Sequence, residues 1–343
     1  MIEHLAGPPL SARSLEDWEM ITENDVTAIG SRAGDSSRSI TMLTKIANTW
    51  PRRACVKKQE LQPFFEEGKE DFLESLIPFR EMPQYQSCSP ELRSRVLSCG
   101  WLMYNAKTVQ IETEIVNPAC LSIIAREMPG LAGPSAQLGV CEAMVDEMYH
   151  VHMVEQASRL TRDQRALDHI VIPKFNLVRH MQNRQREFDE PWQRRMVRFA
   201  TAVVSEIFIS DYLHLLSESD EIQSFNRMTV AAHRHDELAH GPLFRSLAQL
   251  FSTELTKSQR GTFADLLAES VVWFADRELD VWLALLRQIQ FPGADGMIEE
   301  CGSLGMVDLK KLDYSGVVSL AEEIGVMEAA VDRDSFFRQG LIV

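Results

Sequence analysis

Two short stretches of this sequence, VDEMYH at residues 145–150 and HDELAH at residues 235–240, share the pattern Asp-Glu-x-x-His. Each lies in a longer segment with helical residue spacing, so its Glu and His share one face of a helix. At that spacing a carboxylate oxygen and an imidazole nitrogen can reach one metal ion. One Glu-x-x-His is close to what chance supplies in 343 residues, but two among nine histidines, both preceded by aspartate, predict a shared metal site.

The repeated motif predicts an all-α fold around a four-helix bundle. In di-iron carboxylate bundles, two helices each supply a Glu-x-x-His and two others each supply one glutamate. Ser89-Pro90-Glu91 offers an N-cap, a proline and an early acid for the first helix, which is expected to run towards PGLAGP with a kink at Pro118. The polar turn SESDE makes the third and fourth helices antiparallel neighbours. The expected helices cover residues of about 89–129, 134–160, 191–217, 220–252 and 257–290, with short helical pieces in 161–190 and near 315–326.

One glutamate is expected from each helix that lacks the motif. Glu206 lies in an apolar stripe of the third helix, where burying a carboxylate is costly unless it is paired or coordinated. The first helix offers Glu112 and Glu114, which point to nearly opposite sides of the helix. Glu112 shares its face with residues such as Leu97 and Trp101, whereas Glu114 lies on a face that looks solvated. We therefore predict Glu112.

The expected donors are carboxylates and imidazoles without a thiolate, which suit iron or manganese better than copper(I) or structural zinc. Iron is expected, because two ferrous ions that share carboxylate bridges can each give an electron to O₂. His233 falls on the stripe of the second motif, either as a third nitrogen ligand or as a buried histidine beside the site. Asp146 and Asp236 are expected to hold the metal-binding imidazoles through the second ring nitrogen; the alternative is an exposed helical aspartate. The predicted ligands are Glu112, Glu147, His150, Glu206, Glu237 and His240.

Composition narrows the class of protein. The 35 basic and 50 acidic residues give a formal net charge of −15, which disfavours nucleic acid and anionic membranes as partners. We find neither an uninterrupted apolar stretch of membrane-spanning length nor a secretory signal, so a cytoplasmic protein is expected.

The six cysteines include no Cys-x-x-Cys pair and are expected to be packing residues. Residues 1–37 are expected to form an irregular N-terminal extension, followed by a single helical domain at 38–343.

Beyond the two motifs, the chain resembles the ferritin-like di-iron arylamine N-oxygenases, the p-aminobenzoate N-oxygenase family of antibiotic biosynthesis. Short matches such as YSG are weak, but the order and spacing of the others are specific. The matching segments are TWPRRA (49–54), IPF (77–79), RVLSCGWLMYNAKTVQIETEIVNPA (95–119), VDEMYH (145–150), AVVSEIF (202–208), HRHDELAHG (233–241) and YSG (314–316).

The resemblance implies a ligand set and a reaction. Family members use four glutamates and three histidines, which adds His233 to the predicted metal ligands. The implied reaction oxidises an aromatic primary amine with O₂, through hydroxylamine and nitroso stages and a peroxo-di-iron intermediate, to a nitro group. An external electron donor and a homodimer are also implied.

The C-terminal segment departs from the aminobenzoate-specific type. That type has an arginine soon after its SGA-like turn that can hold the substrate carboxylate, whereas this chain has Val317 and Val318. The segment is more similar to relatives that finish chloramphenicol-type antibiotics, whose arylamine is larger and uncharged at its far end. Three alternatives stay open: a di-iron hydroxylase or desaturase that oxidises carbon, an amine oxidation that ends in an azoxy product, and iron storage in a cage.

Overall fold

The computed structural model describes residues 33–58, 61–304, 313–325 and 330–342. Within these ranges the protein consists of helices, loops and one isolated bridge between Glu70 and Ile222, without an extended strand, which confirms the all-α prediction. The long helices are α1 (Ala33–Arg53), α3 (Pro90–Ile111), α5 (Pro134–Arg165), α7 (Pro191–Ser217), α8 (Ser224–Thr253) and α9 (Lys257–Phe274). The shorter elements are η2 (Cys55–Lys57), η3 (Glu74–Leu76), α2 (Pro83–Gln86), η4 (Glu112–Val116), α4 (Asn117–Ile124), α6 (Asn176–Arg186), α10 (Leu279–Gln288), α11 (Ala294–Ser303), α12 (Ser315–Glu323) and α13 (Ala330–Arg338).

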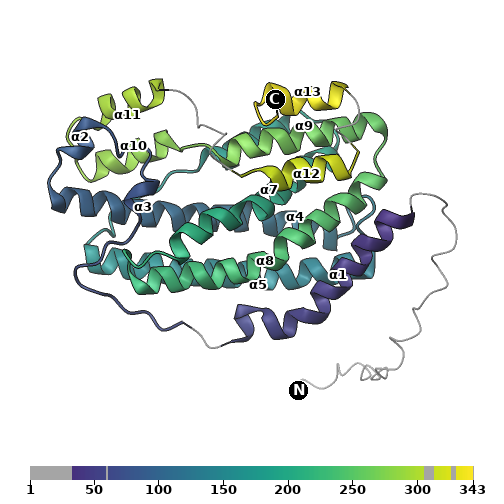
Figure 1. Ribbon diagram of the computed structural model, residues 1–343, viewed down its shortest axis with the longest axis horizontal. Coiled ribbons are helices and arrows are strands. Elements are labelled where there is room, and N and C mark those ends of the chain that lie inside the picture. The colour runs from purple at the N-terminus through teal and green to yellow at the C-terminus, as the bar shows by residue number, and fades with distance from the viewer. Residues whose placement is uncertain (1–32, 59–60, 305–312, 326–329, 343) are drawn as a thin grey trace, which may run out of the picture.

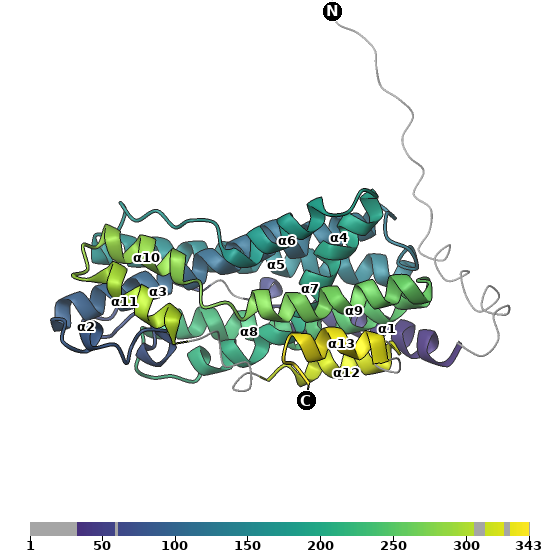
Figure 2. The ribbon, with the colours of Figure 1, turned by 90° about the horizontal axis from the view of Figure 1, so that it is seen from above.

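Helices α3, α5, α7 and α8 form the elongated core of the molecule (Figures 1 and 2). α3 packs along α5, α5 along α8, and α8 along α7, so the predicted four-helix bundle is confirmed. The short connection at 218–223 makes α7 and α8 neighbours, as expected from the SESDE turn. α1 crosses both α5 and α8 on the side of the bundle that lies at the bottom of Figure 1.

Two apolar clusters fill the two ends of the bundle. Ala143 of α5 and Leu243 of α8 belong to one cluster, and Ala157 of α5 and Val230 of α8 belong to the other. Both Asp-Glu-x-x-His motifs lie between these positions. The chemistry-bearing residues therefore occupy the middle of the bundle, with close-packed apolar side chains on either side.

The predicted first helix is interrupted where it carries Glu112. The Ser89 side chain accepts a hydrogen bond from the Leu92 N–H at 3.2 Å, which confirms the predicted cap. A π-helical turn spans Glu112–Val116, and α4 then begins with Pro118 in its first turn. The irregularity expected at Pro118 thus lies before the proline, where the widened turn accommodates its missing N–H. Such π-turns within α-helices often occur at functional sites.

The prediction of one long helix over 257–290 is wrong, because the chain breaks between α9 and α10. Glu278 adopts a left-handed backbone conformation with φ of 52° and is buried. Its carboxylate accepts the N–H of Asn176 at the start of α6 at 2.7 Å, and Lys107 Nζ lies 3.5 Å away. Contacts with α6 and α3 therefore fix a break that the amphipathic pattern did not reveal.

The predicted N-terminal extension is only partly comparable with the structure. Residues 1–32 lie outside the described residues. In the described residues, α1 begins at Ala33, within the range predicted for the extension.

Within the described part of the chain, α7 is long and apolar enough to cross a membrane, judged by length and composition alone. The expectation that no stretch reaches this length was therefore too strict. In the structure, 71% of its apolar window is buried inside the protein, which is the environment of a core helix.

Candidate metal centre

The two motifs face each other in the middle of the bundle. α5 supplies Glu147 and His150, and α8 supplies Glu237 and His240 together with His233. Each of these side chains is at most 3% exposed. Spacings of three, four and seven residues place all of them on the inner faces of their helices.

The donor atoms form two adjoining groups, and within each group they lie within 4.8 Å of one another. Glu147 and Glu237 belong to both groups. His150 and His233 complete the first group, and Glu206 and His240 complete the second. Each group could hold one metal ion, with the two glutamates shared.

Glu147 links the two motif histidines. Its Oε2 lies 2.8 Å from Nδ1 of His150, and its Oε1 lies 2.7 Å from Nδ1 of His240. Glu237 Oε1 lies 3.1 Å from Nε2 of His233 and 3.4 Å from Nδ1 of His240. The Nδ1 atoms of both motif histidines therefore face the shared carboxylates.

The two predicted glutamates outside the motifs converge on the same place. Glu206 Oε2, from α7, lies 3.6 Å from Nδ1 of His240. Glu112, at the start of the π-turn, is 1% exposed and hydrogen-bonds to Glu147, although it lies beside the two groups rather than within them. Glu114 points away and binds Lys174 at 2.7 Å. The structure thus brings all seven predicted residues together, with Glu112 at the edge.

Burial and mutual repulsion set the charges of the glutamates. Burial and the neighbouring Glu147 raise the pKa of Glu112 well above its usual range, and burial and Glu237 do the same to the pKa of Glu206. Burial also opposes ionisation of Glu147 and Glu237, but the charge of His240, together with His150 for Glu147 and His233 for Glu237, lowers the pKa of both. The pKa shifts therefore favour the ionised form of the two shared glutamates and the protonated form of the outer two.

The pKa values of the three histidines also shift in two directions. Burial alone would lower the pKa of His150, but Glu147, Asp236 and Glu237 together raise it to about 9. Glu147 also raises the pKa of His240 well above its usual range, against the effect of burial. Burial and the charge of His150 lower the pKa of His233. At neutral pH and without a metal ion, His150 would therefore carry a proton on Nδ1, which faces Glu147.

Many of the buried oxygen and nitrogen atoms that could bind a metal ion have no hydrogen-bond partner among the described residues. Glu206 Oε2 and Glu237 Oε2, for example, are buried and accept no hydrogen bond. Buried polar atoms without partners are rare and costly, and coordination would satisfy them. Four glutamates would also balance the charge of two divalent cations. The orphaned atoms are Glu112 Oε2, Glu147 Oε1, Glu206 Oε2, Glu237 Oε2, His240 Nδ1 and both ring nitrogens of His233.

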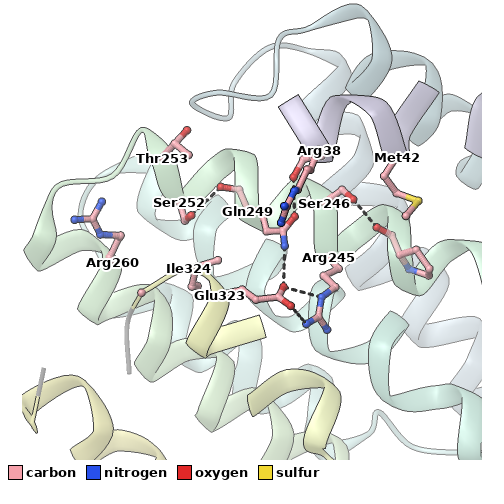
Figure 3. A pocket seen from close by; sticks show the side chains of 13 residues that line it. Arg38, Met42, Arg245, Ser246, Gln249, Ser252, Thr253, Arg260, Glu323 and Ile324 are labelled. Atoms are coloured by element: carbon pink, nitrogen blue, oxygen red, sulfur yellow. Dashed lines mark hydrogen bonds and ion pairs between the residues drawn. The ribbon is translucent and has the colours of Figure 1, made fainter. Parts of the chain in front are cut away.

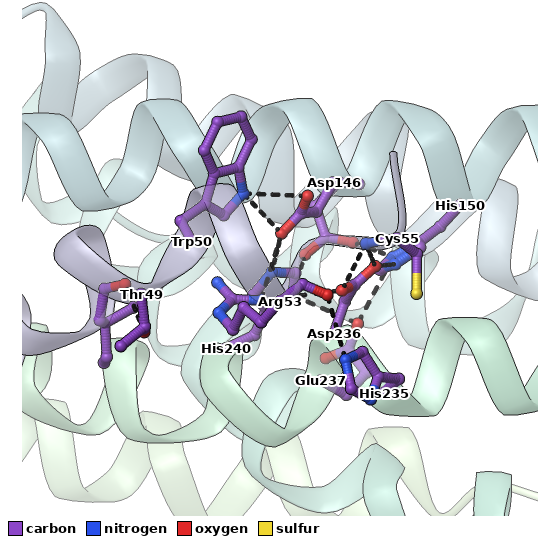
Figure 4. Close-up of polar contacts among 12 residues, drawn as sticks. Thr49, Trp50, Arg53, Cys55, Asp146, His150, His235, Asp236, Glu237 and His240 are labelled. Atoms are coloured by element: carbon purple, nitrogen blue, oxygen red, sulfur yellow. Dashed lines mark hydrogen bonds and ion pairs between the residues drawn. The ribbon is translucent and has the colours of Figure 1, made fainter. Parts of the chain in front are cut away.

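The aspartate of each motif contacts the histidine of the other motif, on the other helix (Figure 4). Asp146 on α5 accepts a hydrogen bond from Nε2 of His240 on α8 at 3.2 Å, and Asp236 on α8 accepts one from Nε2 of His150 on α5 at 3.3 Å. Both aspartates are fully buried, so the alternative of exposed helical residues does not hold. Because a carboxylate can only accept, these contacts place a proton on Nε2 and direct Nδ1 of each ring towards the glutamates.

The sequence did not reveal the contribution of α1. Trp50 Nε1 donates to Asp146, the Cys55 N–H donates to Asp236, and Arg53 lies between the two aspartates. TWPRRA carries part of the family resemblance, but no residue type or spacing in it points to motifs that lie 96 and 181 residues further along the chain. Only the fold brings these segments together.

A third group of possible donors, Cys55, His235 and Asp236, lies beside this contact. Burial and the charge of Asp236 raise the pKa of the Cys55 thiol to about 12, so it remains protonated. Asp236 already accepts from His150 and from the Cys55 N–H. We therefore assign this group to the packing of α1 and not to a metal ion.

A hollow of about 680 Å³ lies elsewhere, between α1, α8 and α12 (Figure 3). Its lining includes Arg245, which pairs with Glu323 through Nε and Oε2 at 2.9 Å, and Gln249, which donates to the same carboxylate at 2.8 Å. None of the seven predicted ligands lines it. The hollow is therefore separate from the candidate metal centre.

Comparison with known proteins identifies relatives of this chain. Residues 37–325 match the family described as P-aminobenzoate N-oxygenase AurF, a range that contains all seven clustered residues. The chain is also 27% identical over 297 residues to a 4-aminobenzoate N-oxygenase of Streptomyces thioluteus, covering 85% of this chain and 88% of that protein. The family resemblance stated from the motifs is confirmed. The chain belongs to the p-aminobenzoate N-oxygenase family and is an oxygenase.

Proposed function

We propose that the seven clustered side chains bind two iron ions. The observation that carries the proposal is the pair of adjoining buried groups that share Glu147 and Glu237. Oxygen and nitrogen donors without a thiolate suit iron. When bound, two ferrous ions would supply electrons and open coordination positions for O₂ activation. The proposed ligands are Glu112, Glu147, His150, Glu206, His233, Glu237 and His240.

The proposed reaction is the oxidation of an aromatic primary amine to a nitro compound through hydroxylamine and nitroso stages. Conversion of the amine to the hydroxylamine inserts one oxygen atom of O₂ and reduces the other to water, which requires two electrons and two protons from outside. An external electron donor is therefore part of the proposal. Family membership supports oxidation at nitrogen over oxidation at carbon.

We further propose a larger, uncharged arylamine of the chloramphenicol type as the substrate. Val317 is fully buried and Val318 packs against the same apolar cluster, at the place where the aminobenzoate-specific type has its arginine. Arg245 does approach this turn, donating to the Gly316 carbonyl at 3.1 Å, but its charge is paired with Glu323. Among the residues that the structure describes, none of those named here offers a free cation to a substrate carboxylate at this turn.

Metal loading and turnover test the proposed reaction. Anaerobically reduced protein is expected to hold about two irons per chain and, when O₂ is admitted, to convert a neutral arylamine to its nitro derivative. Metal analysis, mass spectrometry of the product formed from isotopically labelled O₂, and binding titrations of both amine types measure the outcome. Consumption of O₂ without change in the amine would rule out N-oxygenation. Tight binding of p-aminobenzoate without binding of the neutral amine would rule out the substrate class, and a dominant azoxy product would replace the nitro end point.

We propose a homodimer formed through the outer face of α5. Leu138, Val145 and Met148 are 52%, 45% and 51% exposed, and with the exposed Cys141 they form a stripe at helical spacing. Such a stripe is typical of a helix that packs against a partner. Light scattering is expected to give twice the chain mass of 39.0 kDa, and Leu138→Glu to give a monomer. Val171→Glu, at an exposed apolar residue outside the stripe, is the control; a wild-type monomer would exclude the dimer.

The cysteines support a cytoplasmic location. All six lie among the described residues and none is disulfide-bonded. Free thiols of this kind are typical of a reducing compartment. We therefore propose that the enzyme acts in the cytoplasm.

A further inference from the structure

The last turn of α1 contacts the aspartate of the first motif (Figure 4). Trp50 Nε1 lies 3.1 Å from Oδ1 and 3.0 Å from Oδ2 of Asp146. The same carboxylate accepts from Nε2 of His240 at 3.2 Å. A continuous hydrogen-bonded chain thus leads from Trp50 through Asp146 to His240, whose other ring nitrogen faces the glutamates.

The residue that follows α1 serves the aspartate of the second motif. α1 ends at Arg53, and Ala54 leaves the helix with φ of −55° and ψ of 130°. The Cys55 N–H then begins a short 3₁₀ turn, where it has no acceptor within the turn, and it donates to Asp236 at 3.1 Å. His235 donates from α8 to the Arg53 carbonyl at 3.1 Å, which fixes the end of α1 in place.

Arg53 is a cation shared by both aspartates. Its Nη1 lies 3.5 Å from Oδ2 of Asp146 and 3.7 Å from Oδ1 of Asp236. The aspartate side chains are fully buried, whereas that of Arg53 is 17% exposed. Arg53 therefore offsets two buried negative charges, each of which also holds an imidazole of the cluster.

We propose that α1 is a positioning element for the metal centre, with Arg53 acting on both metal positions and Trp50 acting on one. The inference rests on the proposed metal centre. Trp50 reaches the group that contains His240, because the motif aspartate to which it donates is Asp146. Arg53 reaches both groups through the two aspartates. Changing the outer partner of a metal-binding histidine lowers metal affinity by about 10–100-fold, and the lower end applies here, since Trp50 and Arg53 act through the aspartates.

Cobalt(II) titration of the metal-stripped full-length protein tests this, with the visible absorption of bound Co²⁺ as the readout. Wild-type protein is expected to bind two tight equivalents. Trp50→Phe keeps an aromatic ring and removes the donor, so it should keep one tight equivalent and weaken the other about tenfold. Arg53→Gln should weaken both, and Arg53→Lys should recover part of the loss. Arg52→Gln, at the neighbouring exposed position, is the matched control and should titrate like wild type.

The outcomes separate positioning from packing. Wild-type cobalt binding by Trp50→Phe, or an equal loss at both positions, overturns the selective role of Trp50. The stripped Trp50→Phe and Arg53→Gln proteins could also melt at lower temperatures while their cobalt binding is unchanged. That result would mean that α1 only stabilises the fold, and it would overturn the inference. Wild-type protein that takes up fewer than two equivalents overturns the metal centre itself, a result distinct from a failure confined to the variants.

Discussion

Replacing Glu147 with glutamine is expected to abolish tight binding of both metal ions. Glu147 belongs to both donor groups, and its two oxygens lie 2.8 and 2.7 Å from Nδ1 of His150 and His240. An amide offers one neutral oxygen where the two positions share two charged ones. We expect a loss of at least about 100-fold in affinity at each position, the upper end for changes outside the coordination sphere. Cobalt titration and metal analysis measure it.

Two matched variants make this result specific. Glu206→Gln changes a residue of one group only, so it should lose one equivalent and keep the other. Glu155→Gln lies on the exposed side of the same helix as Glu147 and should bind both equivalents normally. Circular dichroism checks that each variant is folded. Two tight equivalents in Glu147→Gln would show that this glutamate does not bridge the two positions.

The position of the cluster could be predicted because it depends on local rules. A Glu and a His three residues apart share a helix face in any sequence, and the two copies of the motif identified the helices that must meet. Amphipathic patterning also separated Glu112 from Glu114, since only one of them could face the core. The structure shows that the seven predicted residues converge, whereas their role as metal ligands stays a prediction.

The α1 contacts could not be predicted because their donors have no sequence signature. The Cys55 N–H is a backbone group that every residue except proline carries, and it is free only because α1 ends at Arg53. Trp50 and Arg53 are unremarkable residues of an amphipathic helix until that helix crosses α5 and α8. Such information lies in the tertiary arrangement.

In two helices, the sequence predicted the type of element but not where it is interrupted. The break at Glu278 follows from hydrogen bonds to the start of α6 and a charge from α3, which outweigh a continuous amphipathic pattern. The π-turn at Glu112–Val116 lies just before Pro118, so the proline signalled a disturbance but not its place or form. Local propensity set the type of element, and tertiary contacts set where each element is interrupted.

Metal affinity is expected to rise steeply with pH. Glu112 and Glu206 have raised pKa values because of burial and neighbouring carboxylates, and the pKa of His150 is raised to about 9. His150 therefore holds a proton at neutral pH, and Glu112 and Glu206 are shifted towards their protonated forms. A cation can bind only when these protons leave. Each released proton makes the binding constant increase about tenfold per pH unit. Cobalt titrations from pH 6.5 to 9, with an indicator dye to count released protons, measure the slope.

The stability of the metal-stripped protein should change in the opposite direction. A histidine with a raised pKa stabilises the folded state fully below its unfolded value, and this contribution is lost as the pH rises through its folded value. For His150 that window runs from pH 6.5 to about 9, and the raised pKa values of Glu112 and Glu206 act with the same sign at lower pH. The melting temperature of the stripped protein should therefore fall across the window, while loaded protein is protected by its cations.

His169→Asn, at an exposed histidine, should follow the wild-type curve. Cobalt affinity that does not change with pH, or a stripped protein that gains stability towards pH 9, would contradict a cluster in which protons stand where cations bind.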